Sequence, residues 1–311
     1  DTPAALTVPE AIIREEGPLE PHAYYRNKSL NSRVVGFDPE PEEHLRRVEA
    51  AIGTIETSKL DKVVLARAVD IEFPEAIDPR LVAARLIDLS ANRDGFIADL
   101  SPAGRPGAML VGSSPEVLVK RQGSTVSAFP LAGSSPRRAI AAEDHIAGQD
   151  LLHSAKDLHE HSFVVEHLRR VLSPLCERLD IPDAPQLIST NEMWHLGTPI
   201  SGTLKDKDLT ALELALAAHP TPAICGTPAE AAQALIETAE TDRGFYAGAV
   251  GWCDSTGDGE YMVAIRCAEV AGDGLSARAW AGGGIVGDSD AQAELEETTA
   301  KLRTILKALS L

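Results

Sequence analysis

Residues 245–270, FYAGAVGWCDSTGDGEYMVAIRCAEV, decide the fold class. Apolar and aromatic runs flank the polar segment CDSTGDGE (253–260), and this pattern predicts a β-hairpin with the polar segment as its turn. A hairpin pairs its two strands antiparallel. Similar apolar or alternating runs, bounded by Gly, Ser and Pro, predict further strands at 62–73, within 107–133, within 184–204 and at 275–286.

Helical periodicity predicts helices among these strands, at 42–57, 79–89, 142–178, 209–218, 229–238 and 291–309. Because hairpin-connected strands are interleaved with helices, the sequence predicts a single α+β domain over 1–311 with largely antiparallel sheets. Its core is placed at 41–311. Residues 1–40 indicate strand and loop and begin without Met, so we interpret them as the remnant of a longer N-terminal part.

Composition excludes several classes of function. A chain of 311 residues that is 44% hydrophobic and 24% charged can bury a large core. Its formal charge of −18 argues against binding to nucleic acid or to anionic membranes, which would repel it. The four cysteines form no CxxC pair, a pattern typical of reduced thiols, so we expect a cytoplasmic protein rather than a disulfide or zinc framework.

The stretch HSAKDLHEHSFVVEHLRR (153–170) is the first candidate for chemistry. Asp157, Glu160 and His161 are spaced i, i+3 and i+4, so they share one helical face. Taken alone, such a face is more often simply solvated. A metal site would need a further carboxylate from elsewhere in the chain.

The last predicted helix supplies such carboxylates. Glu294, Glu297, Thr298 and Lys301 form a polar strip that, taken alone, again indicates a solvated face. The helix follows AGGGIVGDSD (281–290), whose small residues either serve close packing or expose amides that bind an anion. Carboxylates beside an anion-binding loop suit Mg²⁺ bridging to a substrate carboxylate, since Mg²⁺ prefers oxygen ligands.

Three further charges stand in or beside apolar strands. Lys62 opens one strand, where desolvation favours the neutral form of a lysine that can act as a base. Burial of Glu116, in GSSPEVLV, would suit it to general acid work. Arg266, midway along VAIRCAEV, needs a partner, often a carboxylate. Each could instead be an edge charge or a structural ion pair. The sequence contains no GxSxG elbow, P-loop or HExxH motif.

Together these stretches resemble a known family. The blocks that carry the resemblance, in their order along the chain, are DKVVLARAVDI, LVGSSPEVLVKR, PLAGSSPRR, SAKDLHEHSFVV, HLGTPISGTL, HPTPAICGTP, FYAGAVGWCD, VAIRCAEV, AGGGIV and ELEETTAKL. They follow the order found in the chorismate-utilising enzymes, which include anthranilate synthase component I and salicylate synthases, and they look most like isochorismate synthases. The resemblance spans roughly residues 45–309. It implies a single α+β domain with a central sandwich of two large antiparallel sheets and helices packed outside.

The resemblance also implies a role for each candidate residue. It makes Lys62 the general base and Glu116 the general acid. It makes Glu160 and Glu297 the magnesium-holding carboxylates, with Asp157 and Glu294 nearby and the flanking histidines beside the site or in solvent. It places Arg266 and the amides around Gly282 at one substrate carboxylate. It places Gly133, Ser134 and Lys301 at the carboxylate of the enolpyruvyl arm, and Ala223 close to the substrate.

The implied reaction is the Mg²⁺-dependent isomerisation of chorismate to isochorismate. Lys62 would deprotonate a water that attacks ring C2, and Glu116 would protonate the hydroxyl that leaves C4. Anthranilate synthases carry Gln at the position of Lys62, and aminodeoxychorismate synthases carry Lys at that of Ala132, so both fit poorly. Salicylate synthases, which usually carry Thr at the position of Ala223, stay open. So does a non-catalytic small-carboxylate binder of the same fold.

The resemblance further implies a monomer whose partner is its small-molecule substrate. The sequence does not decide whether isochorismate would supply siderophore or menaquinone biosynthesis, because that depends on neighbouring enzymes.

Overall fold

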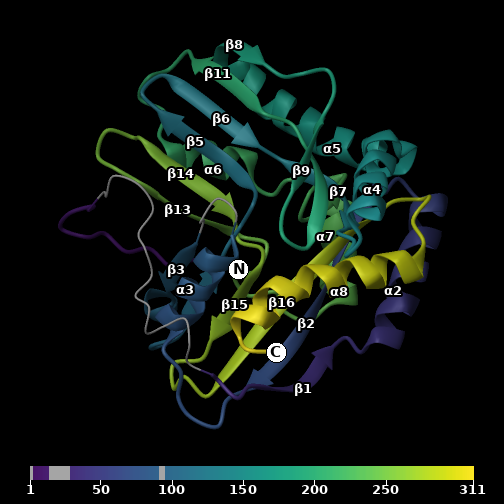
Figure 1. Ribbon diagram of the computed structural model, residues 1–311. Helices are drawn as coiled ribbons and strands as arrows, with labels where there is room; N and C mark the ends of the chain where they lie inside the picture. Colours follow the sequence, from purple (N-terminus) through teal and green to yellow (C-terminus); the bar gives the residue numbers. More distant parts are fainter. Residues whose placement is uncertain (1–2, 14–28, 91–94) are drawn as a thin grey trace.

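A computed structural model describes residues 3–13, 29–90 and 95–311. Three antiparallel sheets and seven α-helices make up this part of the chain, and the α+β class is confirmed (Figure 1). No helix in these ranges is both long and apolar enough to cross a bilayer.

The largest sheet has seven strands. Its order is β1 (Arg33–Asp38), β2 (Lys62–Glu72), β16 (Ser276–Ile285), β15 (Cys267–Val270), β4 (Met109–Gly112) and β3 (Phe96–Asp99), and the short β12 (Gly226–Thr227) pairs with the start of β2. The first eight residues of β2 are all buried, so this strand is covered on both faces. Lys62, the first residue of this strand, therefore lies inside the protein.

The second sheet has six strands. Their order is β13 (Ala249–Cys253), β14 (Gly259–Val263), β5 (Val117–Gln122), β6 (Thr125–Phe129), β11 (Ile200–Leu204) and β8 (Cys176–Asp180). Strands β13 and β14 form the hairpin predicted from residues 245–270, with its turn at residues 254–258.

A third sheet was not predicted from the sequence. It has three strands, in the order β7 (Leu131–Pro136), β10 (Met193–Gly197) and β9 (Gln186–Ser189). Strand β7 follows β6 after Pro130 alone. The chain thus passes directly from the six-stranded sheet into the small one.

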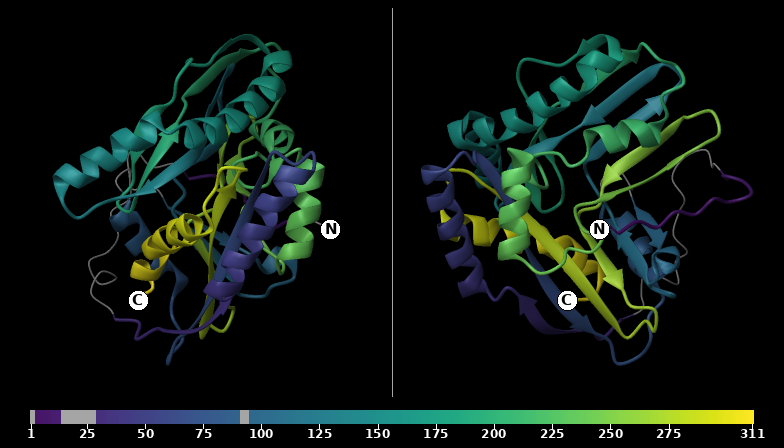
Figure 2. Two further views of the ribbon diagram at one scale, coloured as in Figure 1. Left: turned by 90° about the vertical axis from the view of Figure 1, so that its right-hand side faces the viewer. Right: turned by 180° about the vertical axis from the view of Figure 1, so that it is seen from behind.

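The helices lie outside the sheets. They are α2 (Pro41–Thr57), α3 (Pro79–Leu89), α4 (Ala141–His153), α5 (Ala155–Leu172), α6 (Ala211–Ala218), α7 (Ala229–Ala239) and α8 (Ala291–Ala308), with 3₁₀ turns at Ser101–Ala103 and Ser173–Leu175. The further views show α2 and α8 against the seven-stranded sheet, whereas α4 and α5 pack at the small sheet (Figure 2).

The single helix predicted over 142–178 is wrong in two respects. It is divided at Ser154, whose hydroxyl accepts a hydrogen bond from the Asp157 amide and so caps α5. It also ends at Leu172, where the chain tightens into the 3₁₀ turn Ser173–Leu175 and then enters the edge strand β8; Pro174 has no amide hydrogen with which to continue the α-helical bonding. The cap leaves Asp157 in the first turn of α5.

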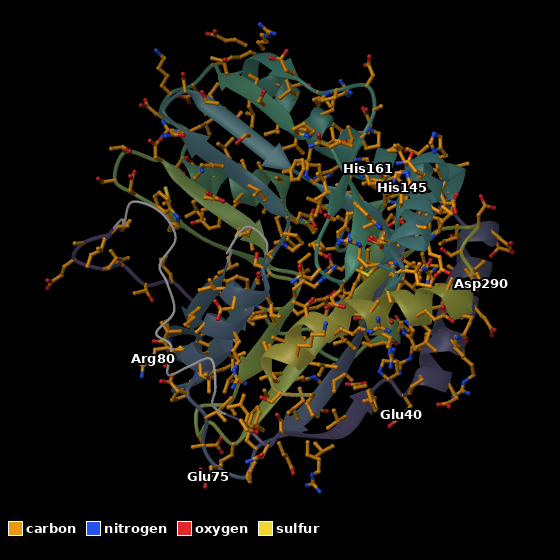
Figure 3. All side chains as sticks on the ribbon, in the orientation of Figure 1. Glu40, Glu75, Arg80, His145, His161 and Asp290 are labelled. Atoms are coloured by element: carbon orange, nitrogen blue, oxygen red, sulfur yellow. The ribbon has the colours of Figure 1, made fainter. Side chains whose placement is uncertain are left out.

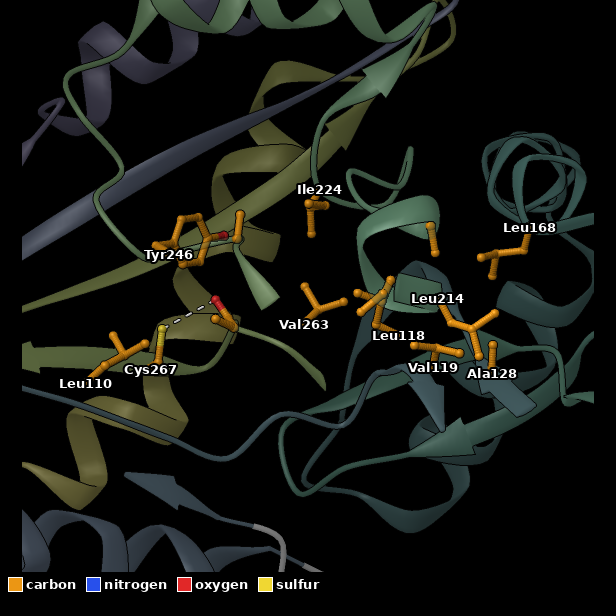
Figure 4. Close-up of a cluster of buried hydrophobic side chains, with 14 of the residues drawn as sticks. Leu110, Leu118, Val119, Ala128, Leu168, Leu214, Ile224, Tyr246, Val263 and Cys267 are labelled. Carbon is orange, nitrogen blue, oxygen red and sulfur yellow. Dashed lines mark hydrogen bonds between the residues drawn. The ribbon is translucent and has the colours of Figure 1, made fainter. Parts of the chain in front are cut away.

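A buried apolar cluster joins the two large sheets (Figure 4). Leu110 and Cys267 come from the seven-stranded sheet, and Leu118 and Val263 come from the six-stranded sheet. The predicted sandwich is therefore present. A second buried cluster joins the outer face of the seven-stranded sheet to α3 and α8.

Candidate active site

A cavity opens where the seven-stranded sheet, the three-stranded sheet and α8 converge. Strands β2 and β16 form one wall, β7 and β10 another, and the segments around residues 223 and 246 close it. Eight of the ten residues predicted from the sequence line it: Glu116, Gly133, Ser134, Glu160, Ala223, Arg266, Gly282 and Lys301. The other two, Lys62 and Glu297, form ion pairs with Glu160 and Lys301 in that lining.

Lys62 and Glu160 form a buried ion pair at the base of the cavity. The Lys62 side chain is fully buried, and its Nζ lies 2.9 Å from Glu160 Oε1, although it makes no well-aligned hydrogen bond within the described residues. Burial opposes ionisation of Glu160, but the charges of Lys62 and Lys156 outweigh burial and hold the pKa of Glu160 below its ordinary value. Glu160 is therefore an anion at neutral pH.

More carboxylates gather beside Glu160. Glu294 is 1% exposed, its Oε1 lies 2.9 Å from Lys156 Nζ, and its Oε2 lacks a hydrogen-bond partner in the described structure. Burial, with the charges of Glu297 and Glu160, raises the pKa of Glu294 to about 7. Burial opposes the charge of Lys156, yet the surrounding carboxylates raise its pKa above the ordinary value. The polar strip of the last helix thus faces the protein interior, not solvent as its pattern alone indicated.

Lys301 closes this carboxylate cluster, which comprises Asp157, Glu160, Glu294 and Glu297. Its Nζ lies 2.6 Å from Glu297 Oε1 and donates a hydrogen bond to the Gly282 carbonyl at 2.8 Å. Burial also raises the pKa of Asp157. Lysines 62, 156 and 301 therefore pair with members of the cluster.

The glycine run of β16 brings backbone close to these carboxylates. A Cβ at Gly284 would lie 2.1 Å from Glu160 Oε1, and one at Gly283 would lie 2.9 Å from Glu294 Oε2. Both distances are shorter than a side chain tolerates. The run therefore leaves space for the carboxylates.

Glu116 contributes a different kind of carboxyl group. It follows β4, is 3% exposed and lines the cavity. Burial raises its pKa to about 8, although a hydrogen bond from the Leu131 amide and the charges of Lys62 and Lys301 act in the opposite direction. Glu116 is thus mainly protonated at neutral pH, which the sequence predicted as a consequence of burial.

Arg266 does not lie midway along a strand, as its pattern suggested. It occupies a bend between β14 and β15 with φ of 51°, and its side chain lines the cavity. Its Nη2 lies 3.2 Å from His195 Nε2, and no carboxylate of the described residues forms an ion pair with it. Burial lowers the pKa of Arg266 to about 10, so it stays a cation.

Among the cavity residues missing from the predicted site, three have polar or aromatic side chains: His195, Tyr246 and Trp280. His195, in β10, joins Arg266 to Ser134, whose Oγ lies 2.8 Å from its Nδ1, and burial holds the pKa of His195 well below the ordinary value. Tyr246 and Trp280 line the cavity with their rings stacked at 5.9 Å. The available signal for His195 was a single histidine inside the apolar strand MWHLG.

His161 shows why helical spacing alone misjudges a side chain. It shares the face of Asp157 and Glu160, yet it is buried outside the cavity lining. Figure 3 labels His161 at α5, beside the small sheet. Its ring nitrogens lie 3.1 Å from the Ala132 carbonyl and 2.7 Å from Thr198 Oγ1. Its role in this structure is to join α5 to β7 and to the residue that follows β10.

The donor chemistry of the carboxylate cluster fits Mg²⁺. Carboxylate oxygens are preferred Mg²⁺ ligands, and the buried Glu294 Oε2 has no partner in the part of the chain described. Mutual repulsion of Glu294, Glu297 and Glu160 would be relieved by a cation. Among the described residues, no three acidic, Cys or His side chains are already arranged as a metal-binding group, and lysines lie against the carboxylates.

Comparisons with known proteins identify the family. The model of the chorismate binding enzyme family matches residues 11–310. This chain belongs to that family. Isochorismate synthase DhbC of Bacillus subtilis is 43% identical over 98% of this chain and 77% of its own length.

Solved structures of the family share the fold. The menaquinone-specific isochorismate synthase MenF from Escherichia coli superposes with a TM-score of 0.78 at 28% identity, covering 91% of this chain and 64% of that one. Anthranilate synthase component I from Streptococcus pneumoniae gives a TM-score of 0.73 at 26% identity, over 89% and 60% of the two chains. The family relationship therefore extends to anthranilate synthase component I.

Proposed function

We propose that this protein is an isochorismate synthase, an isomerase that converts chorismate to isochorismate. The relatives support the activity. The observation that carries the proposal is that a buried carboxylic acid and a buried amine lie at the same cavity. Glu116 is protonated at neutral pH and lines the cavity, and Lys62 is a fully buried amine beside the same cavity. A protein that merely bound a small carboxylate would need neither group.

The reaction needs an acid and a base because water is a poor nucleophile and hydroxide is a poor leaving group. Lys62 would take a proton from a water as its oxygen bonds to ring C2. The ring double bonds shift, the C4–O bond breaks, and Glu116 gives its proton to the departing hydroxyl. One water enters and one leaves, so product and substrate have the same mass.

Substrate binding would use the cations of the cavity. Chorismate carries two carboxylates, and a chain with a net charge of −18 must concentrate positive groups locally to hold them. Arg266 is buried and paired with a neutral histidine, so its guanidinium is available to one carboxylate. Ser134 and Lys301, with the backbone at Gly133, are proposed to bind the other.

The proposed metal residues are Glu160 and Glu297, with Asp157 and Glu294 nearby. When bound there, Mg²⁺ would neutralise the ring carboxylate of chorismate as charge shifts through the diene. Lys62 must be unprotonated to act as a base, and the carboxylate of Glu160 lies 2.9 Å from its Nζ. A cation bound by Glu160 would compete with Lys62 for this carboxylate.

Incubation of the purified protein with chorismate, with and without Mg²⁺, tests the proposal. We expect an equilibrating pair of isomers of equal mass that forms only with Mg²⁺. Lys62→Ala should lower the rate by at least ~10²-fold. Stoichiometric pyruvate with a fluorescent aromatic product would identify a salicylate synthase, and binding without turnover would identify the non-catalytic alternative.

A further inference from the structure

One edge of β2 lacks a neighbouring strand beside the cavity. Along its other edge, β2 pairs with β16 from Val63 to Glu72. On this edge β12 pairs only with Lys62 and Val63, and β1 pairs only from Ala68 onward. Between them no described strand pairs with residues 64–67 on this edge, and the Val64 amide donates to the Cys225 carbonyl at 2.8 Å, next to β12.

Side chains complete this edge. The Ala66 amide donates to Glu240 Oε1 at 2.7 Å, and the Val64 carbonyl accepts from Arg243 Nη2 at 2.7 Å. One carboxylate acceptor and one guanidinium donor thus replace the groups that a neighbouring strand would offer. Glu240 and Arg243 also bind each other through two contacts, at 2.7 and 2.8 Å.

Arg243 connects this edge to two further parts of the cavity wall. Its Nη1 donates to the Ile224 carbonyl at 2.8 Å, and its own carbonyl accepts from the Tyr246 amide at 3.0 Å. Val64, Ile224 and Tyr246 all line the cavity, whereas neither Glu240 nor Arg243 does.

Strand geometry extends this connection to Lys62. Lys62 and Val64 are two residues apart on β2, so their side chains project from the same face of the strand. Ala223 precedes Ile224 in the opposing wall. We propose that the Glu240–Arg243 pair is a positioning element that fixes the spacing between the strand of Lys62 and the wall of Ala223. The inference rests on the proposed function, because it takes Lys62 as the base.

A lysine cannot replace Arg243 in this role. The planar guanidinium binds one carboxylate and two carbonyls in different directions, whereas an ammonium group keeps the charge but not this geometry. Arg243→Lys is thus the sharpest variant. It preserves the charge next to Glu240 and alters the spacing of the walls.

The chain contains a matched control far from the cavity. Arg121 is 5% exposed and likewise binds one carboxylate, Asp258 at 2.7 Å, and two carbonyls, of Thr256 and Lys207 at 2.9 and 2.6 Å. None of these four residues lines the cavity. Arg121→Lys should therefore reproduce the loss of a buried arginine network without moving the site.

The experiment measures kcat, KM for chorismate and melting temperature in Arg243→Lys and Arg121→Lys. Small misplacement of a reacting group lowers the rate steeply, so kcat of Arg243→Lys should fall ~10- to 100-fold with KM changed by less than about threefold. Both variants should melt at similar temperatures, and Arg121→Lys should keep its kcat. Glu240→Gln, which retains an acceptor for Ala66, should lose less activity than Arg243→Lys.

A double variant tests whether the effect passes through Lys62. In a Lys62→Ala background, Arg243→Lys should lower the residual rate by less than about twofold, because the base it positions is absent. An equal fall in both backgrounds, or equal loss of kcat in the two arginine variants, would overturn the inference. A wild-type rate in Arg243→Lys beside an inactive Lys62→Ala would also overturn it and leave the proposed function standing. A wild-type rate in Lys62→Ala would overturn the function itself.

Discussion

The surroundings of Glu116 and of Glu160 differ within a single cavity. Both glutamates are almost fully buried, at 3% and 7% exposure, and burial disfavours the anion of each. Glu160 has the ammonium group of Lys62 at 2.9 Å, so its pKa lies below the ordinary value. Glu116 has no ion pair in the described structure, and its pKa rises to about 8. Adjacent charge, more than burial, decides which buried carboxyl group is an acid and which is an anion.

The largest expected effect comes from removing the anionic carboxylates, Glu160 and Glu297. Glu160→Ala and Glu297→Ala should each reduce turnover of chorismate to background, as should excess chelator with the unaltered protein, because the proposed metal residues are lost or stripped. Glu166→Ala provides the control, since Glu166 lies on the exposed face of the same helix α5. Full activity in chelator would remove Mg²⁺ from the mechanism.

The same two variants should differ in stability. Glu160→Ala leaves the fully buried Lys62 without its partner, and breaking a buried pair costs about 3 kcal/mol or more of unfolding free energy. Glu297→Ala should cost less, because its partner Lys301 is 16% exposed, whereas Lys62 is fully buried, and Lys301 keeps its hydrogen bond to the Gly282 carbonyl. Denaturant unfolding of both proteins without metal measures the difference. Equal losses would mean that Lys62 does not depend on Glu160.

Removing the protonated carboxyl group of Glu116 should have the next largest effect. Glu116→Gln keeps the shape of the side chain and an oxygen for the Leu131 amide, but it has no proton to give to a leaving hydroxyl. Its kcat should fall by at least ~10²-fold, with the fold retained. Steady-state kinetics and circular dichroism measure the two quantities. Near-normal turnover in this variant would exclude Glu116 as the general acid.

The raised pKa of Glu116 also predicts the pH dependence. The value of kcat/KM should fall as pH rises through about 8, because the free enzyme loses the proton that Glu116 must donate. Stability has the same sign. The folded-state pKa exceeds the ordinary value of 4.5, so the stabilisation is complete below pH 4.5 and is lost as pH rises toward 8. Unfolding free energy should therefore fall relative to Glu116→Gln by roughly 3 to 5 kcal/mol across that window.

Local patterns in the sequence located much of this structure. The hairpin turn and the strand that begins at Lys62 were predicted from residues close to one another in the chain, whereas the burial of Glu116 was one of two open alternatives. The division of α4 from α5 was missed because helical periodicity continues through Ser154, whereas the cap is a single hydrogen bond. Arg266 was assigned to a strand because its left-handed backbone conformation leaves no mark in a run of apolar residues.

Contacts between distant segments account for the rest of the site. The strip on α8 has the pattern of a solvated face, and only packing against α5 and β16 makes Glu294 and Thr298 interior residues. The resemblance to a family suggested which residues meet there. The structure adds the lysine opposite each carboxylate and the role of His195 between Ser134 and Arg266. Spacing could suggest the Lys301–Glu297 pair, which is i, i+4 on α8, but not the Lys62–Glu160 pair or the contacts of His195, whose partners are tens of residues apart in the chain.

The smallest expected effect concerns the product and not the rate. Ala223 lines the cavity, as does the next residue, Ile224, and the alanine side chain can form no hydrogen bond. By the family resemblance, a threonine at this position accompanies pyruvate elimination. Ala223→Thr should therefore release a minor fraction of pyruvate from chorismate while isochorismate stays the main product.

Ala223→Val is the matched control, because valine has the shape of threonine without its hydroxyl. Pyruvate, measured by a coupled assay, should rise in the threonine variant and not in the valine variant. If both variants release pyruvate, then the size of the side chain, by displacing substrate, decides the outcome. If neither does, residue 223 does not select the product, and the difference between synthase and lyase must lie elsewhere in the wall that Arg243 joins to β2.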